Sequence, residues 1–278
     1  MARPPLTLIA YGSLMSGFGL AHLGTLPVVA ARPVRLHNCR RGFGKVSQYG
    51  DRLAMILEPV RANEPIGASY VDESRDERDG IDALALTISL DDFTRVAVRE
   101  GYLADAIQTL AARARAAGQS VAEYLWQQLV ANHFDRARYR RALFAAVEYT
   151  SPHYIPHPVA LTGTEPALTF LAPGLEGSGS DGVTPVRVAT GVTDCLSAVE
   201  AWRRKPNASQ LDYFAMCLLA EVHHISLADV TNGLDAEPVL IERLRERLDR
   251  ERGNEHARFR TALCLSEAAY TNAFTQAA

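Results

Sequence analysis

The feature that most constrains the fold of this chain is a short apolar run that ends in a glycine turn. Residues 6–10, Leu-Thr-Leu-Ile-Ala, lie between two prolines and Gly12. A run this short, with chain-breaking residues on both sides, predicts a buried strand rather than a helix. Gly12 permits backbone conformations that a Cβ atom forbids. A turn at 11–14 would therefore gather backbone N–H groups that suit a carboxylate or a phosphate; the alternative is an ordinary first strand and turn.

Composition predicts a soluble globular protein that does not bind nucleic acid. Of the 278 residues, 47% are hydrophobic and 22% are charged, which is typical of globular domains. The net charge of −3 lacks the basic excess of a nucleic-acid binder. No CxxC spacing occurs among the four cysteines, so we expect reduced thiols. No run reaches the roughly 18 apolar residues of a membrane span, and no signal peptide is evident. We therefore expect a cytoplasmic protein without membrane contact.

Hydrophobic periodicity predicts mainly strands before residue 90. Expected strands follow the first one at 28–36, 53–57 and 66–71. Prolines at 27 and 33 place the 28–36 strand at an edge or across a bend. Residues 16–20 are too rich in glycine for a regular element, and 40–45 form a cationic turn or a ligand contact. The segment 72–82 is a charged loop, and 83–89 fits either a strand or a helix start.

After residue 89 the pattern is mainly helical. Ser89 and the two acids that follow it favour a helix start, and Gly101 favours its end. This helix would carry Arg99 and Glu100 at its C-terminus. The further expected elements are two helices in 103–133 with a break at 117–118, a strand in 143–150, an extended segment at 154–159, and helices at 193–203, from 209, from 238 and from 254 to 274.

Four pieces of the first hundred residues, taken together, resemble the γ-glutamylcyclotransferase superfamily. They are Tyr11-Gly12-Ser13-Leu14, Arg41-Gly42-Phe43, the strand-like segment 65–71, and Arg99-Glu100-Gly101-Tyr102. The ChaC-like and AIG2-like branches are closest in pattern, and the first piece is the most specific. The resemblance covers about residues 6–102 and leaves the C-terminal half unexplained.

The resemblance implies an α+β fold built on a small mixed β-barrel of the γ-glutamylcyclotransferase type. We expect the barrel domain at 1–172, with a helical insertion near 103–141. A flexible loop at 173–192 would follow, and then a helical C-terminal region at 193–278. The helical C-terminal region is foreign to compact members of the superfamily.

The resemblance also implies a chemistry, in which Glu100 is the general base. A protonated amine is not nucleophilic, and a carboxylate of raised pKa in a dry pocket can remove its proton. The α-amine of a γ-glutamyl amine or peptide, glutathione being one candidate, would then attack its own γ-carbonyl. This reaction releases 5-oxoproline and needs no metal or organic cofactor. Because the attack is intramolecular, the protein has mainly to hold the substrate in a reactive shape.

The other expected site residues bind the substrate. Backbone N–H groups of Gly12, Ser13 and Leu14 would hold a carboxylate or the developing oxyanion. Tyr11 would orient the amine or the new ring, and Arg41 would pair with an acidic end of the substrate. In the ChaC-like pattern a few residues separate the Arg-Glu and Gly-Tyr pairs, which here adjoin. The alternative acids are Asp91 and Asp92.

Two other functional classes stay open: a binding or scaffold protein that kept the barrel without the chemistry, and an enzyme of this fold that acts on another acyl-amine.

A metal site is disfavoured, because the prolines around His153 and His157 exclude the helix that their spacing would need. No Walker or GxSxG motif is present, and Gly17-Phe18-Gly19 lacks the third glycine and the helix of a dinucleotide site. Neither the γ-glutamyl substrate nor the oligomeric state follows from the sequence.

Overall fold

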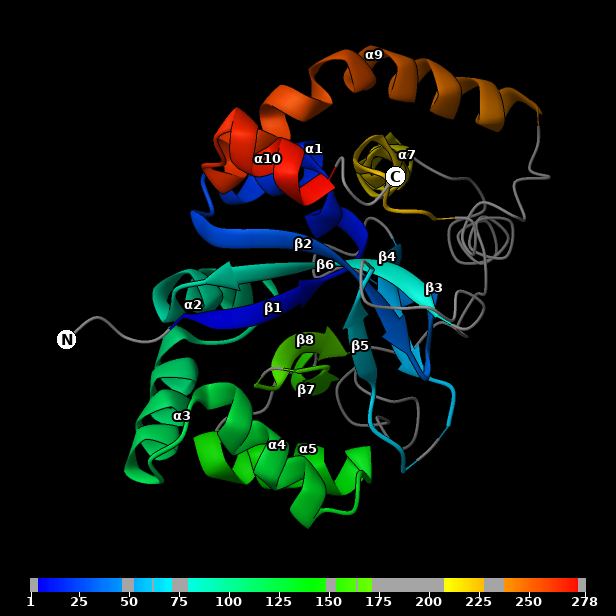
Figure 1. Ribbon diagram of the computed structural model, residues 1–278. Helices are drawn as coiled ribbons and strands as arrows, with labels where there is room; N and C mark the ends of the chain where they lie inside the picture. The colour runs from blue at the N-terminus through cyan, green and yellow to red at the C-terminus, as the bar shows by residue number, and fades with distance from the viewer. Residues whose placement is uncertain are drawn as a thin grey trace.

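The computed structural model describes residues 5–46, 53–61, 63–71, 80–148, 154–163, 165–171, 208–227 and 238–274. Their strands are β1 (Leu6–Ala10), β2 (Val28–His37), β3 (Cys39–Val46), β4 (Leu53–Pro59), β5 (Gly67–Tyr70), β6 (Ile81–Ile88), β7 (Ile155–Leu161) and β8 (Ala167–Leu171). Six of them close into a barrel in the order β1-β6-β2-β5-β7-β8, and β3 and β4 form a separate two-stranded sheet (Figure 1).

The barrel is mixed, as expected. β1 pairs with β6 antiparallel and with β8 parallel, and β5 pairs with β7 parallel. β2 lies between β6 and β5, so the edge position expected from Pro27 and Pro33 is wrong. Closure of the barrel removes free edges, and β2 needs partners on both sides to complete it.

Four barrel strands, β1, β6, β7 and β8, are buried on both faces along most of their length, whereas β2 and β5 are partly exposed. One face of a buried strand lines the interior and the other is covered by helices. Ile9, Ala83 and Ala85 belong to an apolar cluster to which all six barrel strands contribute. Leu84 and Leu86, which alternate with them on β6, belong to the cluster packed with the helices. Side chains of a strand alternate between its two faces, so a strand covered on both sides is apolar along nearly its whole length.

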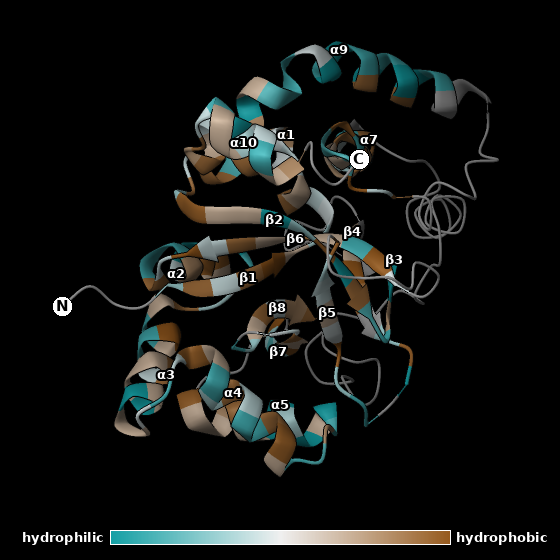
Figure 2. Cartoon of the chain, in the orientation of Figure 1, coloured by the Kyte–Doolittle hydropathy of each residue, from teal (hydrophilic) through white to brown (hydrophobic). Residues whose placement is uncertain are grey.

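Helices cover two sides of the barrel in Figure 1. On one side lie α3 (Ala104–Ala116), α4 (Val121–Ala131) and α5 (Arg136–Val147). On the other lie α1 (Gly17–Leu20), α7 (Ala208–Leu218), α9 (Pro238–Leu263) and α10 (Glu267–Phe274). α2 (Leu90–Arg99) follows β6, and short 3-10 helices are η1 (Gly12–Met15), η2 (Ala21–Leu23) and η3 (Leu219–His223). Figure 2 shows α9 to be largely hydrophilic. The α+β class and the small mixed barrel are confirmed.

Several predicted helix ends are confirmed, because a capping serine or a glycine marks them in the sequence. The Ser89 side chain accepts from the backbone N–H of Asp92 at 3.1 Å and starts α2. α2 ends before Gly101, which has a φ of 96°. α3 and α4 are separated at 117–118, where Gly118 is left-handed with a φ of 69°. A left-handed residue at the end of a helix is most often glycine.

Three other element predictions are wrong. Residues 17–20 form α1, because the Ser16 hydroxyl accepts from the N–H of Gly19 at 3.1 Å. Residues 143–147 belong to α5, which the side chain of Asp135 caps, and not to a strand. α9 runs unbroken through Asn254 to Leu263, and the chain turns at Cys264, which has a φ of 55°.

Residues 40–45 lie inside β3 rather than in a turn, and 81–88 form β6. The glycine-rich segment at 173–181 and the helix predicted at 193–203 lie outside the described residues, as does most of the segment 72–82. The domain boundaries therefore stay predictions. In the described part of the chain, no helix is long and apolar enough to cross a membrane.

Candidate functional site

The turn after β1 has the sharp bend that its glycine predicts. Tyr11 is extended, Gly12 has a φ of +67°, and η1 begins at Gly12 without a side-chain cap on its first N–H groups. The first N–H groups of a helical turn lack acceptors within the turn, so η1 keeps the donor character expected of this segment. A Cβ atom on Gly12 would lie 3.3 Å from the Cβ of Met55. Left-handed geometry and crowding together require glycine here.

The end of α2 contacts this turn directly. Nη2 of Arg99 donates a hydrogen bond to Oγ of Ser13 at 3.1 Å. Nη1 of the same guanidinium is buried and has no hydrogen-bond partner among the residues that the structure describes. The fold therefore brings the Arg-Glu pair to the Tyr-Gly-Ser-Leu turn. Arg99 and Ser13 are 86 positions apart in the sequence.

Glu100 forms the C-terminal cap of α2 and is half-buried. Two buried tyrosines, Tyr154 and Tyr213, and the partly buried Tyr11 lie within reach of its charge. Burial is the main cause that raises the pKa of Tyr11, Tyr154 and Tyr213, and the negative charge of Glu100 raises each of them further. The positive charge of Arg99 opposes this effect at Tyr213. All three phenols therefore stay neutral at physiological pH and keep their hydroxyl protons.

The three hydroxyls hold the backbone around the turn. Tyr11 donates to the carbonyl oxygen of Phe170 on β8. Tyr154 donates to the carbonyl oxygen of Met55 at 2.6 Å, and the Tyr213 hydroxyl accepts from the N–H of Met55 at 2.9 Å. The sequence-based site includes Tyr11 but misses Tyr154 and Tyr213. Neither belongs to a local motif, and Tyr213 comes from α7 in the C-terminal region, so no sequence signal marked it.

The described hydrogen bonds of Arg41 go to backbone carbonyls on two other segments of the chain. Arg41 lies on β3 and is buried, with 4% of its surface exposed. Its Nη1 donates to the carbonyl oxygen of Asp82 and its Nη2 to that of Ser226, each at 3.0 Å. The guanidinium thus ties β3 to β6 and to the segment that follows η3. Its contact with an acidic end of the substrate stays a prediction, whereas Arg99 bonds directly to the turn.

The two alternative acids lie at the other end of α2 from Glu100. Asp92 accepts from the Ser89 hydroxyl at 2.7 Å and pairs with Arg95 at 3.0 Å, and Asp91 is exposed. With a rise of 1.5 Å per residue, Asp91 lies roughly 13 Å along the helix from Glu100. Of the three acids, Glu100 is the one adjoining the residue that contacts the turn.

A buried carboxylate on α9 fixes the chain just after the turn. Glu255 is fully buried and accepts from the N–H of Gly17, from the N–H of Phe18 at 3.1 Å, and from His223 Nε2 at 3.0 Å. Burial lowers the pKa of His223 despite the nearby carboxylate, so the imidazole is neutral at physiological pH. A carboxylate only accepts, so Nε2 carries the proton, and Nδ1 accepts from the Tyr270 hydroxyl at 2.8 Å.

Two glycines let this support reach the turn. A Cβ atom on Gly17 would lie 2.3 Å from the backbone nitrogen of Phe259 on α9. A Cβ atom on Gly19 would lie 1.7 Å from the carbonyl oxygen of Ser13. The C-terminal helices therefore hold the turn by backbone contacts that no larger residue would permit. Gly17 and Gly19 thus allow close packing of the backbone, and nothing in the sequence around them indicates this role.

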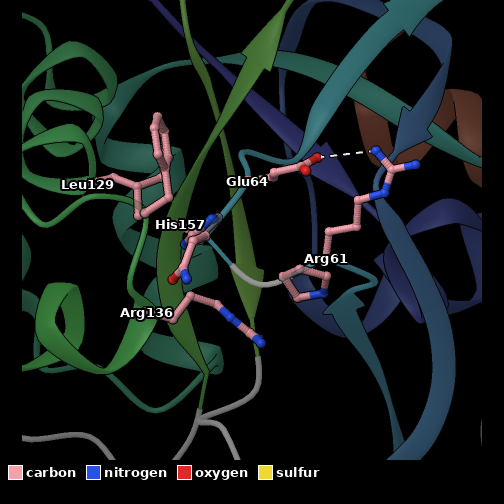
Figure 3. Close-up of a pocket in the computed structure, with 8 residues that line it drawn as sticks. Arg61, Glu64, Leu129, Arg136 and His157 are labelled. Atoms are coloured by element: carbon pink, nitrogen blue, oxygen red, sulfur yellow. Dashed lines mark hydrogen bonds and ion pairs between the residues drawn. The ribbon is translucent and has the colours of Figure 1, made fainter.

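A shallow depression on the α4–α5 side of the barrel contains none of the predicted site residues. Arg61, Glu64, Leu129, Arg136 and His157 line it with others, and Arg61 pairs with Glu64 at 3.5 Å (Figure 3). His157 is buried against Tyr139, and burial lowers its pKa to about 3. In the described ranges, no three potential metal ligands cluster, and Cys39, Cys217 and Cys264 are free thiols.

No protein-family model and no curated protein matches the chain. A solved structure of a γ-glutamyl cyclotransferase specific to glutathione, from yeast, is similar to this chain, with 11% identity and a TM-score of 0.35. The match covers 89% of this chain and 99% of that one. A likeness of this degree carries no argument about activity.

Proposed function

We propose that this protein is a γ-glutamylcyclotransferase-type enzyme that releases 5-oxoproline from a γ-glutamyl amine or peptide. The observation that carries the proposal is the hydrogen bond from Arg99 to Ser13, which sets the Arg-Glu pair beside the Tyr-Gly-Ser-Leu turn. The sequence resemblance rests on these same two motifs. The influence of Glu100 on the pKa of Tyr11 gives further support, because it sets the carboxylate near the first residue of the turn.

In the proposed reaction, Glu100 takes a proton from the α-ammonium group of the substrate. The free amine attacks the γ-carbonyl carbon and closes a five-membered ring. N–H groups of Gly12, Ser13 and Leu14 stabilise the oxyanion as the C–N bond to the leaving amine weakens. Protonated Glu100 then returns this proton to the departing nitrogen. Glu100 also passes the second proton of the ring nitrogen to the released amine, so the products are 5-oxoproline and an ammonium ion. No oxidant, metal or cofactor is required by this balance.

Neutral tyrosines would suit this step. Tyr154 and Tyr213 hold both backbone groups of Met55, and Met55 contacts the position of Gly12. They would therefore keep the turn rigid while charge develops on the substrate. The hydroxyl of Tyr11 is bonded to Phe170, so its ring is the part that would orient the substrate.

The test is an assay for 5-oxoproline after incubation with glutathione and with several γ-glutamyl amino acids. Turnover by the wild type and a loss of roughly 10²- to 10⁴-fold in Glu100→Gln would support the proposal, since positioned general bases contribute factors of that size. Asp91→Asn is the control that tests the alternative acid, and it should retain full turnover if Glu100 is the base. Melting temperatures of both variants report whether each one is folded.

Two results would redirect the interpretation. Turnover that survives Glu100→Gln would remove Glu100 from the role of base. Absence of turnover on every substrate, together with a raised melting temperature in the presence of a carboxylate ligand, would favour the binding or scaffold protein. Turnover of a different acyl-amine alone would favour the other enzyme class.

A further inference from the structure

The guanidinium of Arg99 has a buried nitrogen that none of the described residues satisfies. Nη2 is bonded to Ser13 Oγ at 3.1 Å, whereas Nη1 is buried with no hydrogen-bond partner among the described residues. Buried polar atoms in native proteins are almost always hydrogen-bonded, and each exception calls for an explanation. A buried donor on a cation is more costly still. The missing partner is most simply supplied by a ligand.

The chemistry of the donor selects the class of ligand. A guanidinium is planar and always charged, and its paired N–H groups match the two oxygens of a carboxylate. Arg99 lies beside a turn whose own N–H groups lack a side-chain cap. An anionic group between the guanidinium and η1 would satisfy donors on both sides. The three neutral tyrosines nearby add no competing negative charge.

The next residue carries the opposite charge. Consecutive residues at a helix end project in different directions, so Arg99 and Glu100 present a cation and an anion side by side without occupying one spot. An α-amino acid head group carries a carboxylate and an ammonium group on one carbon atom. The two side chains at the end of α2 match these two charges.

We infer that Arg99 is a specificity-determining residue that binds the α-carboxylate of the γ-glutamyl group, while Glu100 receives its α-ammonium group. The inference rests on the proposed function and names the substrate feature that the site requires: a free α-carboxylate. A γ-glutamyl compound whose α-carboxylate is blocked as a carboxamide would lose this contact and leave Nη1 unsatisfied.

The experiment compares 5-oxoproline with 5-oxoprolinamide, the same ring with a carboxamide in place of the carboxylate. Binding to the wild type and to the variants is measured by calorimetry. The wild type should bind the carboxylate roughly 10- to 100-fold more tightly, the range that a charge-assisted hydrogen bond supports. Arg99→Met should abolish the preference.

Arg95→Met is the matched control. Arg95 lies one turn earlier on α2 and is exposed, and it bonds to the carbonyl oxygens of Leu23 and Thr25. This variant removes a cation from the same helix and should keep the preference. If Arg99→Met does not fold, Arg99→Gln is used instead, because its amide retains polarity and much of the volume and lacks the charge.

Three outcomes would overturn the inference: no binding of 5-oxoproline to the wild type, no preference for the carboxylate in the wild type, or a preference that survives in the folded Arg99 variant. Failure of the proposed function has a different signature. In that case no 5-oxoproline is released from any substrate, yet the Arg99-dependent preference in binding persists.

Discussion

Replacing Glu255 with glutamine should destabilise the protein by roughly 3–5 kcal/mol, because the carboxylate serves three donors and glutamine cannot. Oε1 accepts from the N–H of Gly17 and from His223, and Oε2 accepts from the N–H of Phe18. Whichever oxygen becomes an NH₂ group, one backbone N–H then faces another donor. The mutation preserves the volume of the side chain, so the effect isolates hydrogen bonding and charge.

The magnitude follows from two contributions. A buried N–H left without an acceptor costs about 1–3 kcal/mol. Each of the two hydrogen bonds that survive loses its charged acceptor, which weakens it by about 1 kcal/mol. For a protein of this size, the sum corresponds to a fall in melting temperature on the order of 10 °C.

Urea and thermal unfolding, followed by circular dichroism, give the change in stability. Glu246→Gln is the matched control, since Glu246 also lies on α9 and is exposed. Substitution of an exposed residue usually changes the free energy of unfolding by less than about 0.5 kcal/mol. Hydrogen exchange should accelerate at Gly17 and Phe18 in Glu255→Gln.

A loss of stability in Glu255→Gln no larger than the loss in Glu246→Gln would refute this reasoning. It would mean that the Glu255 carboxylate contributes little to holding the segment after the turn against α9. A large loss with unchanged exchange at the two amides would place the effect at His223 instead.

Two further predictions concern packing and pH. Gly19→Ala should destabilise the protein by more than about 2 kcal/mol, because the new Cβ would overlap the backbone carbonyl of Ser13. Gly253→Ala on α9, where nothing lies within 4 Å of the added atom, should instead stabilise it by about 0.5–1 kcal/mol, and urea midpoints of the two variants provide the check. His157 is neutral when folded, with a pKa of about 3, against roughly 6.5 when unfolded. The unfolded chain therefore binds more protons between these values, and stability falls as the pH drops from about 6.5 towards 3, by up to about 1.4 kcal/mol per pH unit. His157→Phe should make urea midpoints between pH 7 and 4.5 less dependent on pH, and an unchanged slope would contradict the assignment.

Local signals determined the elements around the site. The apolar run with its glycine predicted β1 and the turn, and Ser89 with Gly101 bounded α2. These features depend on interactions between residues close in sequence, such as a cap or a left-handed glycine. The α+β class and the mixed barrel came from the resemblance, whereas α5 and the full length of α9 were missed.

What the sequence by itself determined is therefore the strand, the turn, the helix that ends in Arg99 and Glu100, and the hypothesis of cyclotransferase chemistry. Only the tertiary structure decided that Arg99 contacts Ser13, that Arg41 bonds to backbone carbonyls, and that Tyr213 and Glu255 come from the C-terminal helices to support the turn. Contacts across 41 to 238 positions depend on how the barrel closes and which helices cover it. No local pattern of residues encodes those distances, because the same motif can face a site or face solvent according to what packs against it.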